Sequence, residues 1–230
     1  MTRFRLPNDF EDRESRALVE VVPVPKGETV FKEGDKADLF YIVASGVVRT
    51  YTVSNDGRRI IDNFHFADDI LGLNAGAQHR FYAASVCDSV VAGIRRSDLD
   101  KVIGCDKELG RRVQSSLLVS LGRAQDHAVL MGLSTAREKI EAFLGAMAER
   151  ASRSGTPKLQ LRQSDIADYL GLSRETVSRV LSTLNATELA TLGIRGHGHG
   201  SLAQSTPNSS RAARTLPLSM WCTLAIATSP

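Results

Sequence analysis

The sequence predicts an α+β fold, with a β-roll first, a long helix after it and a helix-turn-helix in the second half. Three observations support this fold class. Short segments of β-branched and aromatic residues, separated by glycines, fill the chain from Val21 to Arg95. From Asp106 to about Met131, apolar residues recur every three or four positions instead. After Leu161, small and apolar residues stand at the spacing of a helix-turn-helix.

The first part of the chain has the pattern of short antiparallel strands. Strands are favoured in four segments, VVPVPKGETVFKEGD, LFYIVASGVVRTYTV, RRIIDNFHF and YAASVCDSVVAGI. Turns between them are marked by Gly27, Gly34, Gly46 and Gly57. Asp56 and Gly57 predict a hairpin turn in which both residues take positive φ. Because no long helix separates these strands, we expect an antiparallel roll or barrel.

An apolar stripe runs along the expected long helix. Its members are Leu109, Val113, Leu117, Leu121, Ala124 and Ala128. Leu118 and Leu130 lie off the stripe, so two faces of the helix need burial. One face would pack on the roll, and we expect the stripe to pair with a second copy of the chain, as in a two-stranded coiled coil. The alternative is a core helix that lies only against the roll.

The helix-turn-helix is predicted from the spacing of small and apolar residues. A capping box at Thr135 and Glu138 opens the preceding helix, REKIEAFLGAMAER. The inward positions of the motif are then filled by Ile166, Ala167, Leu170, Leu172, Val177 and Val180. Gly171 permits the turn between the two helices, and Ser173 is a suitable N-cap for the second helix. This distribution fixes which side of the second helix faces outward.

The outward side of the second helix has the side chains of a DNA-reading surface. The predicted base-reading residues are Arg174, Glu175, Ser178 and Arg179, with Ser182 beside them. Arginine binds guanine bidentately, and a carboxylate accepts from cytosine N4. Glu175 and Arg179 are four residues apart, so we also expect an ion pair between them. The alternative without a binding function is a solvated helix face with one surface ion pair.

Other polar residues of the motif are placed to meet DNA phosphates. The predicted phosphate contacts are Arg162, Gln163, Ser164 and Thr176. Such contacts position a recognition helix without specifying a base sequence. The partner that these residues imply is double-stranded DNA.

Charge is unevenly distributed along the 230 residues. Residues 1–150 contain 21 Lys and Arg against 22 Asp and Glu, whereas residues 151–230 contain 8 against 4. A basic second half favours a nucleic-acid surface. The charged N-terminal stretch MTRFRLPNDFEDRES is unlike a signal peptide, and no run of about 18 apolar residues occurs. We therefore expect a cytoplasmic protein without a membrane partner.

The cysteines and histidines give no pattern of a cofactor site. Cys87, Cys105 and Cys222 are scattered without the spacing of a disulfide framework or a closed zinc site. Cys87 is expected to be a small buried residue, whereas Cys105, near the start of the long helix, leaves redox sensing as an alternative. Haem binding by His65 or His79 is another alternative. No cofactor or metal is expected.

The order of these parts resembles the Crp/Fnr family of bacterial transcription regulators. The resemblance covers roughly residues 20–185 and rests on KGETVFKEGDKADLFYIVASGVVRTYTVSNDGRR, ILGLNAG and DIADYLGLSRETVSRVLSTL. It implies a cyclic-nucleotide-binding-like β-roll, a long dimerisation helix and a C-terminal winged helix-turn-helix. It also implies a homodimer that binds promoter DNA and works with RNA polymerase.

The resemblance extends to the residues that would read DNA. Glu175, Ser178 and Arg179 match the pattern typical of the Fnr and FixK branches, which read TTGA-type half-sites. Arg174 also matches Crp-type recognition helices, so a half-site intermediate between TTGA and TGTGA stays open.

The resemblance also bears on the signal that the roll would sense. Family members that bind cyclic AMP have an Arg-Ser or Arg-Thr pair for the cyclic phosphate. Here Phe81 and Tyr82 occupy that place, Arg80 comes one position earlier, and Asp68 stands where the family usually has glycine. An iron–sulfur cluster needs four thiolates, and the chain has three cysteines. The FixK-like branch, without a built-in cofactor, fits best; a cyclic-nucleotide-responsive regulator is the alternative.

The resemblance ends near Gly196. Family members continue into a two-stranded wing, which LATLGIRG could begin, but residues 197–230 have no periodicity. They are interpreted as a disordered tail or as translation in a shifted reading frame. In either case the wing is degenerate, Val180, Leu181 and Leu184 would be poorly covered, and a partly inactive protein becomes a second alternative.

The expected organisation has four parts. They are a roll at residues 1–105, a dimerisation helix at 106–132, a helix-turn-helix domain at 133–196 and the tail at 197–230. The resemblance implies a dimeric activator of microaerobic and nitrogen-fixation genes that binds a palindromic TTGA-like site. No paired carboxylates beside a histidine, nucleophile elbow or metal spacing stand out, so we do not expect an enzyme.

Overall fold

The computed structural model describes residues 19–73, 76–98, 107–155 and 161–184. The strands are β1 Val19–Val24, β2 Thr29–Phe31, β3 Leu39–Ser45, β4 Val48–Val53, β5 Arg59–His65, β6 Ile70–Leu71, β7 Tyr82–Ser85 and β8 Ser89–Arg95. The helices are α3 Lys107–Met131, α4 Ala136–Arg153, α5 Gln163–Leu170 and α6 Arg174–Thr183. The predicted tail and the predicted wing lie outside the described residues.

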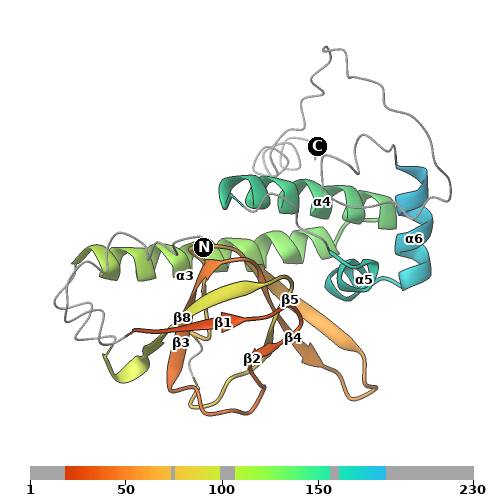
Figure 1. The fold of residues 1–230 in the computed structure, drawn as a ribbon. Coiled ribbons are helices and arrows are strands. Elements are labelled where there is room, and N and C mark those ends of the chain that lie inside the picture. Colours follow the sequence, from red (N-terminus) through yellow and green to blue (C-terminus); the bar gives the residue numbers. More distant parts are fainter. Residues whose placement is uncertain (1–18, 74–75, 99–106, 156–160, 185–230) are drawn as a thin grey trace, which may run out of the picture.

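The eight strands form two antiparallel sheets that face each other as a roll (Figure 1). One sheet has the order β1-β8-β3-β6 and the other has the order β2-β7-β4-β5. Alternating residues of the strands turn inward, and Val43, Val48 and Val91 are completely buried between the sheets. The α+β class and the antiparallel roll predicted from the sequence are therefore confirmed.

The turns of the roll depend on left-handed backbone positions. All four glycines that mark turns in the sequence have positive φ, and at Gly46 a Cβ would lie 2.7 Å from the Asp88 carbonyl oxygen. The β4–β5 hairpin differs from the prediction, because Gly57 has positive φ and Asp56 does not. The Gly57 amide donates to the Ser54 carbonyl (2.8 Å), so glycine closes a longer loop instead of a two-residue turn. Asp68 has φ 70°, a conformation that glycine adopts more readily.

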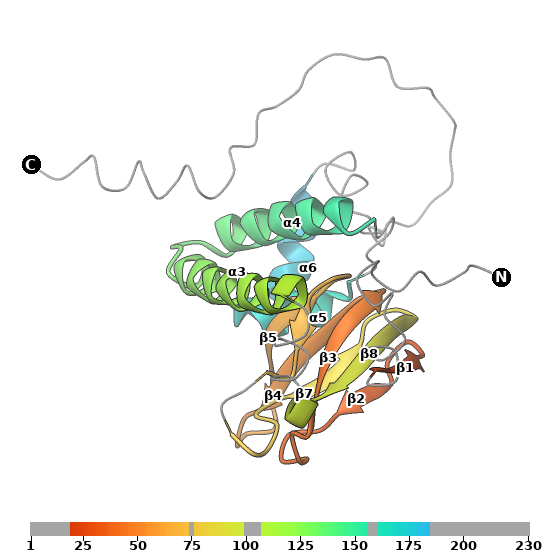
Figure 2. The same ribbon diagram turned by 90° about the vertical axis from the view of Figure 1, so that its left-hand side faces the viewer.

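Helix α3 lies between the roll and α4, as the two perpendicular views show (Figures 1 and 2). Val113 is buried against the roll, in a cluster with Phe40 and Ile94. It was predicted to meet a second copy of the chain, and here it packs on the roll instead. Leu117 and Leu121 of the predicted stripe are 49% and 57% exposed, and Ala124 and Ala128 are also exposed. The side chain of Leu109 lies outside the described part.

The C-terminal helices share one hydrophobic core with the roll. This core joins Phe64 of β5, Leu130 of α3, Phe143 of α4, Tyr169 of α5 and Val177 of α6. The Phe64 and Tyr169 rings lie 5.6 Å apart, and those of Phe143 and Tyr169 lie 4.9 Å apart. The helical part is therefore packed on the roll and is not a separate body on a linker.

The capping box that opens α4 is present as predicted. The Glu138 amide donates to the Thr135 hydroxyl (3.1 Å), and the Thr135 amide donates to the Glu138 carboxylate (3.0 Å). Helices α4 and α6 then pack together. Leu181 and Leu184 are buried in the shared core and Val180 is half-buried, so the poor cover expected from a degenerate wing is not found.

Candidate nucleic-acid interface

Helices α5 and α6 form the helix-turn-helix predicted from the sequence. Gly171 ends α5 in the left-handed conformation, with φ 63° and ψ 32°, and the Leu172 amide donates to the Ala167 carbonyl (3.0 Å). A side chain at position 171 would be strained, and its Cβ would lie 3.2 Å from the Met131 side chain. Ser173 then caps α6 by accepting a hydrogen bond from the Thr176 amide (3.1 Å).

The inner side of the motif is buried as the spacing requires. Ile166, Leu170 and Val177 have no exposed surface, and Ala167 has 4%. A larger residue at Ala167 would compete for the space in which α6 crosses α5. These contacts fix the rotation of α6 about its own axis, so its remaining residues face outward.

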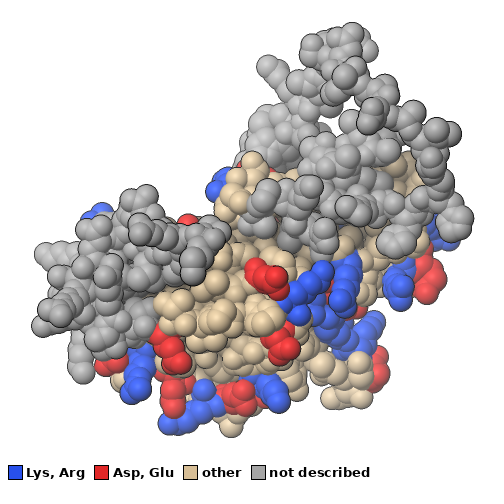
Figure 3. Space-filling model, viewed as in Figure 1, with Lys and Arg blue, Asp and Glu red and all other residues tan. Residues whose placement is uncertain are grey.

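The predicted base-reading residues are brought together on the outer side of α6. Arg174, Glu175, Ser178 and Arg179 are all exposed, and so is Ser182. An exposed, closely spaced set of this kind can reach base edges when the first turns of a helix enter the major groove. Figure 3 shows basic side chains gathered where the roll meets α5, with more charged side chains at the nearby end of α6.

Glu175 keeps its carboxylate free of the predicted partner. Among the ion pairs of the described residues there is none between Glu175 and Arg179. The pKa of Glu175 is lowered by hydrogen bonds from its own backbone amide and from Ser173 at the start of α6. The carboxylate is therefore stabilised in the charged form that accepts hydrogen bonds, and the exposed Arg179 is not paired with it.

The predicted phosphate contacts lie at the starts of the two helices. Arg162 is the exposed N-cap position of α5, and Gln163 and Ser164 in its first turn are half-buried. Thr176 is half-buried in the first turn of α6, where its hydroxyl lies 3.0 Å from that of Ser173. Helix starts carry positive potential, which suits phosphate binding.

Sequence reasoning missed the charged residues that fix α5 on the roll. Arg49 of β4 and Arg59 of β5 make ion pairs with Asp165 of α5, at 3.1 and 2.6 Å. Arg59 also pairs with Asp168 at 2.6 Å. These partners are more than 100 residues apart, so no local spacing indicates that they meet.

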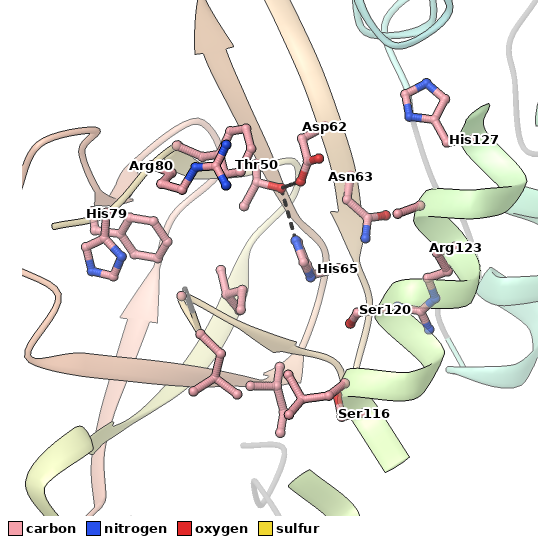
Figure 4. Close-up of a pocket in the computed structure, with 18 of the residues that line it drawn as sticks. Thr50, Asp62, Asn63, His65, His79, Arg80, Ser116, Ser120, Arg123 and His127 are labelled. Carbon is pink, nitrogen blue, oxygen red and sulfur yellow. Dashed lines mark hydrogen bonds between the residues drawn. The ribbon is translucent and has the colours of Figure 1, made fainter. Parts of the chain in front are cut away.

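A second candidate site is a cavity of about 440 Å³ between the roll and α3 (Figure 4). Its polar wall includes Thr50, Asp62 and His65 from the roll and His127 from α3. Thr50 Oγ1 donates to the Asp62 carboxylate (3.1 Å) and lies 3.1 Å from His65 Nε2. Burial raises the pKa of Asp62, so this wall is poorly suited to a second negative charge.

Of the residues at the expected cyclic-phosphate position, the cavity wall includes Arg80 and Phe81. The Arg80 guanidinium lies 5.8 Å from the centre of the Phe81 ring. Tyr82 points elsewhere, since its ring stacks on Tyr51 with centres 5.2 Å apart. Arg123, on the opposite wall, is paired with Asp69 (2.7 Å). The cavity therefore has one arginine at this position, followed by an aromatic residue in place of the expected hydroxyl residue, while Thr50, Ser116 and Ser120 bring hydroxyls to other parts of its wall (Figure 4).

The histidines and the cysteine considered as cofactor or redox residues have structural roles where the structure describes them. His79 stacks on Phe31 with ring centres 3.7 Å apart, and His65 is buried. Cys87 is half-buried, with Sγ 4.0 Å from the Ser89 hydroxyl, so it is less enclosed than predicted. Cys105 and Cys222 lie outside the described part, and within that part no cluster of metal-binding side chains occurs. None of the described helices is long and apolar enough to cross a membrane.

Known proteins share both halves of this architecture. A model of the cyclic nucleotide-binding domain matches residues 21–104, and a model of the Crp-like helix-turn-helix domain matches residues 138–198. The nitrogen fixation regulation protein FixK of Rhizobium meliloti is 35% identical over 166 residues, which cover 72% of this chain and 75% of the relative. FixK of Bradyrhizobium diazoefficiens is 39% identical over 178 residues, which cover 76% and 75%.

The likeness extends to a solved structure. FixK2 from Bradyrhizobium japonicum is 37% identical and superposes with a TM-score of 0.63, covering 76% of this chain and 86% of that chain. The curated relatives are named as regulators, which confirms the expectation that the protein is not an enzyme. With a roll, a long helix and a Crp-like helix-turn-helix in the family's order, the chain belongs to the Crp/Fnr family of DNA-binding transcriptional regulators.

Proposed function

We propose that the protein is a FixK-like transcriptional activator that binds a palindromic, TTGA-like site as a homodimer. The observation that carries this proposal is the exposed set Arg174, Glu175, Ser178 and Arg179 on a helix whose inner side is fully packed. The names of the FixK relatives support genes of nitrogen fixation as targets. Genes of microaerobic respiration are proposed from the resemblance to the FixK branch alone. The DNA would be bound near a promoter, where the activator contacts RNA polymerase.

Selection from random duplex DNA tests the proposed site. The full-length protein should enrich two inverted TTGA-like half-sites whose centres lie about one helical turn apart. Enrichment of TGTGA instead would assign the dominant contact to a Crp-type reading by Arg174. Recovery of no common sequence would contradict the proposal and favour the partly inactive protein.

The homodimer is proposed to form through the free side of α3. Leu117, Leu118 and Leu121 are 49%, 64% and 57% exposed in the single chain, an unusual concentration of leucine on a soluble helix. Other parts of α3 are already covered, because Val113, at the start of the same stripe, packs on the roll and Leu130, on the far side, packs in the shared core. The α3 helix of a second copy of the chain would cover this surface, because it has the same length and the same apolar side chains.

Substituting Leu121 with glutamate should convert the dimer to a monomer. The charge would have to be buried between the two helices, so the dimer dissociation constant should rise at least about tenfold. Sedimentation over a range of concentrations measures the change. Ser115→Glu adds the same charge at an exposed position off the stripe and should leave the dimer intact. Equal effects of the two substitutions would place the interface elsewhere.

The alternative is a regulator that responds to a cyclic nucleotide, and Arg80 in the cavity wall is the observation that favours it. Against it stand Phe81 beside Arg80, where a hydroxyl would be needed, and the buried Asp62 carboxyl in the same wall. We expect calorimetric titration with cyclic AMP and cyclic GMP to show no binding. Saturable heat that disappears in Arg80→Ala would establish the alternative.

The proposed division of the chain follows the four parts expected from the sequence. Helix α3, Lys107–Met131, corresponds to the dimerisation helix at 106–132, and α4 to α6 fall within the helix-turn-helix domain at 133–196. The part at 197–230 remains a proposed tail outside these domains. The nucleotide sequence beyond codon 185 would decide between a native and a shifted reading frame.

A further inference from the structure

Four charged residues join the roll to the helix-turn-helix, and we refer to them as the roll–α5 ion cluster: Arg49, Arg59, Asp165 and Asp168. Asp165 accepts from Arg49 Nη1 through both carboxylate oxygens, at 3.1 and 3.2 Å. It also accepts from Arg59 Nη2 at 2.6 Å. Arg59 Nε donates in turn to Asp168 at 2.7 Å. One arginine thus connects two carboxylates of α5, and one carboxylate connects two strands of the roll.

The centre of the cluster is shielded from water. The Asp165 side chain is 1% exposed and that of Arg49 is 12% exposed, whereas Arg59 and Asp168 are about one quarter exposed. Desolvation lowers the pKa of the Arg49 guanidinium, partly offset by the Asp165 carboxylate. A small shift of α5 along the roll would break these ion pairs while Asp165 stays shielded from water, which is strongly unfavourable. The cluster therefore opposes movement of α5 relative to the roll, because its hydrogen bonds depend on direction as well as distance.

The cluster acts on the turn of α5 that is placed to meet DNA. Asp165 lies in the first turn of α5, directly after Gln163 and Ser164, which are proposed to contact phosphates. The buried residues Leu170 and Val177 then hold α5 and α6 together. A change in the position of α5 on the roll would consequently move α6 by a rigid-body displacement.

The other described polar connections hold the last turn of α5 and the end of α4, not the first turn of α5. The chain between α3 and α4 is a short segment, Gly132 to Thr135. The contact between the Phe64 and Tyr169 rings, 5.6 Å apart, is apolar and does not constrain direction as a hydrogen bond does. The His127 ring stacks on Tyr169 with centres 4.1 Å apart, and its Nε2 donates to the Tyr169 carbonyl (3.0 Å), so α3 holds the last turn of α5.

We propose that the roll–α5 ion cluster determines the spacing of DNA half-sites that the protein accepts. The inference rests on the proposed dimer, in which α3 holds two rolls together and each roll holds its own α5. The separation of the two recognition helices is then set through the rolls, and Arg49 and Arg59 are positioning residues for DNA recognition. Neither needs to touch a base.

The experiment uses the full-length protein and the palindrome that selection recovers. A second duplex has two base pairs inserted between the half-sites, which moves one half-site by about 7 Å and rotates it by about 70°. The readout is the ratio of the two dissociation constants, in which general losses of charge or stability cancel. Wild type should favour the native spacing at least about tenfold.

Arg59→Asp is the informative variant, because it places an acid beside Asp165 and Asp168. The ratio of its dissociation constants for the two spacings should fall to within about twofold of unity. Its affinity for a single half-site should match that of the control variant described next. The control is Arg58→Asp, which makes the same charge change at the neighbouring, exposed hairpin position outside the cluster. The control should keep the wild-type ratio.

A charge exchange tests the pairing itself. Combining Arg59→Asp with Asp168→Arg restores opposite charges across the contact and should restore at least half of the spacing preference on a logarithmic scale. If Arg59→Asp does not fold, as judged by circular dichroism, Arg59→Gln against Arg58→Gln gives the same comparison with a smaller charge change. Restoration would support a direct ion pair as the cause.

The remaining outcomes distinguish the inference from the proposed function. An unchanged ratio in Arg59→Asp would overturn the inference, and so would tighter palindrome binding than wild type, because the cluster would then hold a non-binding orientation. Absence of any spacing preference in the wild type would instead contradict the dimeric palindrome reader on which the inference rests.

Discussion

Arg179→Ala is expected to weaken binding to the selected palindrome by about 1–3 kcal/mol per half-site and to relax the choice of base at one position. Arg179 is exposed on α6, four residues after Glu175, and has no ion pair to that carboxylate. Its guanidinium is therefore available for bidentate binding to guanine O6 and N7. Titration of the selected duplex and of random duplexes, at one fixed salt concentration, measures the effect.

Arg162→Ala is the matched control for this prediction. It removes the same charge from the exposed N-cap position of α5, where a phosphate contact is proposed. Binding should weaken alike on selected and random DNA, and the slope of log K against log salt should decrease by about 1 per half-site, or about 2 for the dimer. If Arg179→Ala behaves in this way too, Arg179 contacts a phosphate and the assignment of base reading is wrong.

Acid should destabilise the protein through His65. This side chain is buried in the roll, and burial lowers its pKa to about 4. Thr50 donates its hydroxyl proton to Asp62, so it accepts from His65 Nε2, and Nδ1 has no hydrogen-bond partner in the described residues (Figure 4). A proton added at Nδ1 would therefore create a buried, uncompensated charge.

The unfolded chain binds that proton with an ordinary histidine pKa near 6.5, whereas the folded protein does not bind it until about pH 4. Between these values only the unfolded state is protonated, so its stability relative to the folded state increases as the pH falls. The free energy of unfolding should decrease by about 2 kcal/mol from pH 7.5 to 5 and by about 3 kcal/mol at pH 4. Above pH 7 the contribution should be constant.

Urea denaturation of wild type and His65→Gln at these pH values measures the His65 contribution. Glutamine can donate to Thr50 but does not titrate in this range, and it leaves His79 and the buried carboxyls in place. The wild type should therefore lose more stability on acidification than the variant does. Parallel curves for the two proteins would show that His65 is not the acid-sensitive group.

The local elements were predictable because their determinants are local. The left-handed Gly171, the Ser173 cap and the Thr135 capping box each depend on residues within four positions of one another. The positions of the strands along the chain followed from glycines that separate short apolar segments. The hairpin error at Asp56 has the same origin, since an Asp-Gly pair is compatible with more than one loop length.

The contacts between distant parts were not predictable in this way. Asp165 lies among polar residues of α5, and its sequence position gives no sign that two arginines from the roll surround it. Val113 belongs to the same stripe as Leu121, yet only Val113 is covered by the roll. Which side of an apolar helix meets which partner depends on the path of the whole chain.

The shared core has a consequence for how the molecule unfolds. Phe64, Leu130, Phe143, Tyr169 and Val177 come from five elements and are packed in one cluster. Separating the helices from the roll would expose this apolar surface on both sides, so neither part retains its full stability alone. The boundary between the roll and the helix-turn-helix is thus not a boundary of folding cooperativity: damage to either part lowers the stability of both.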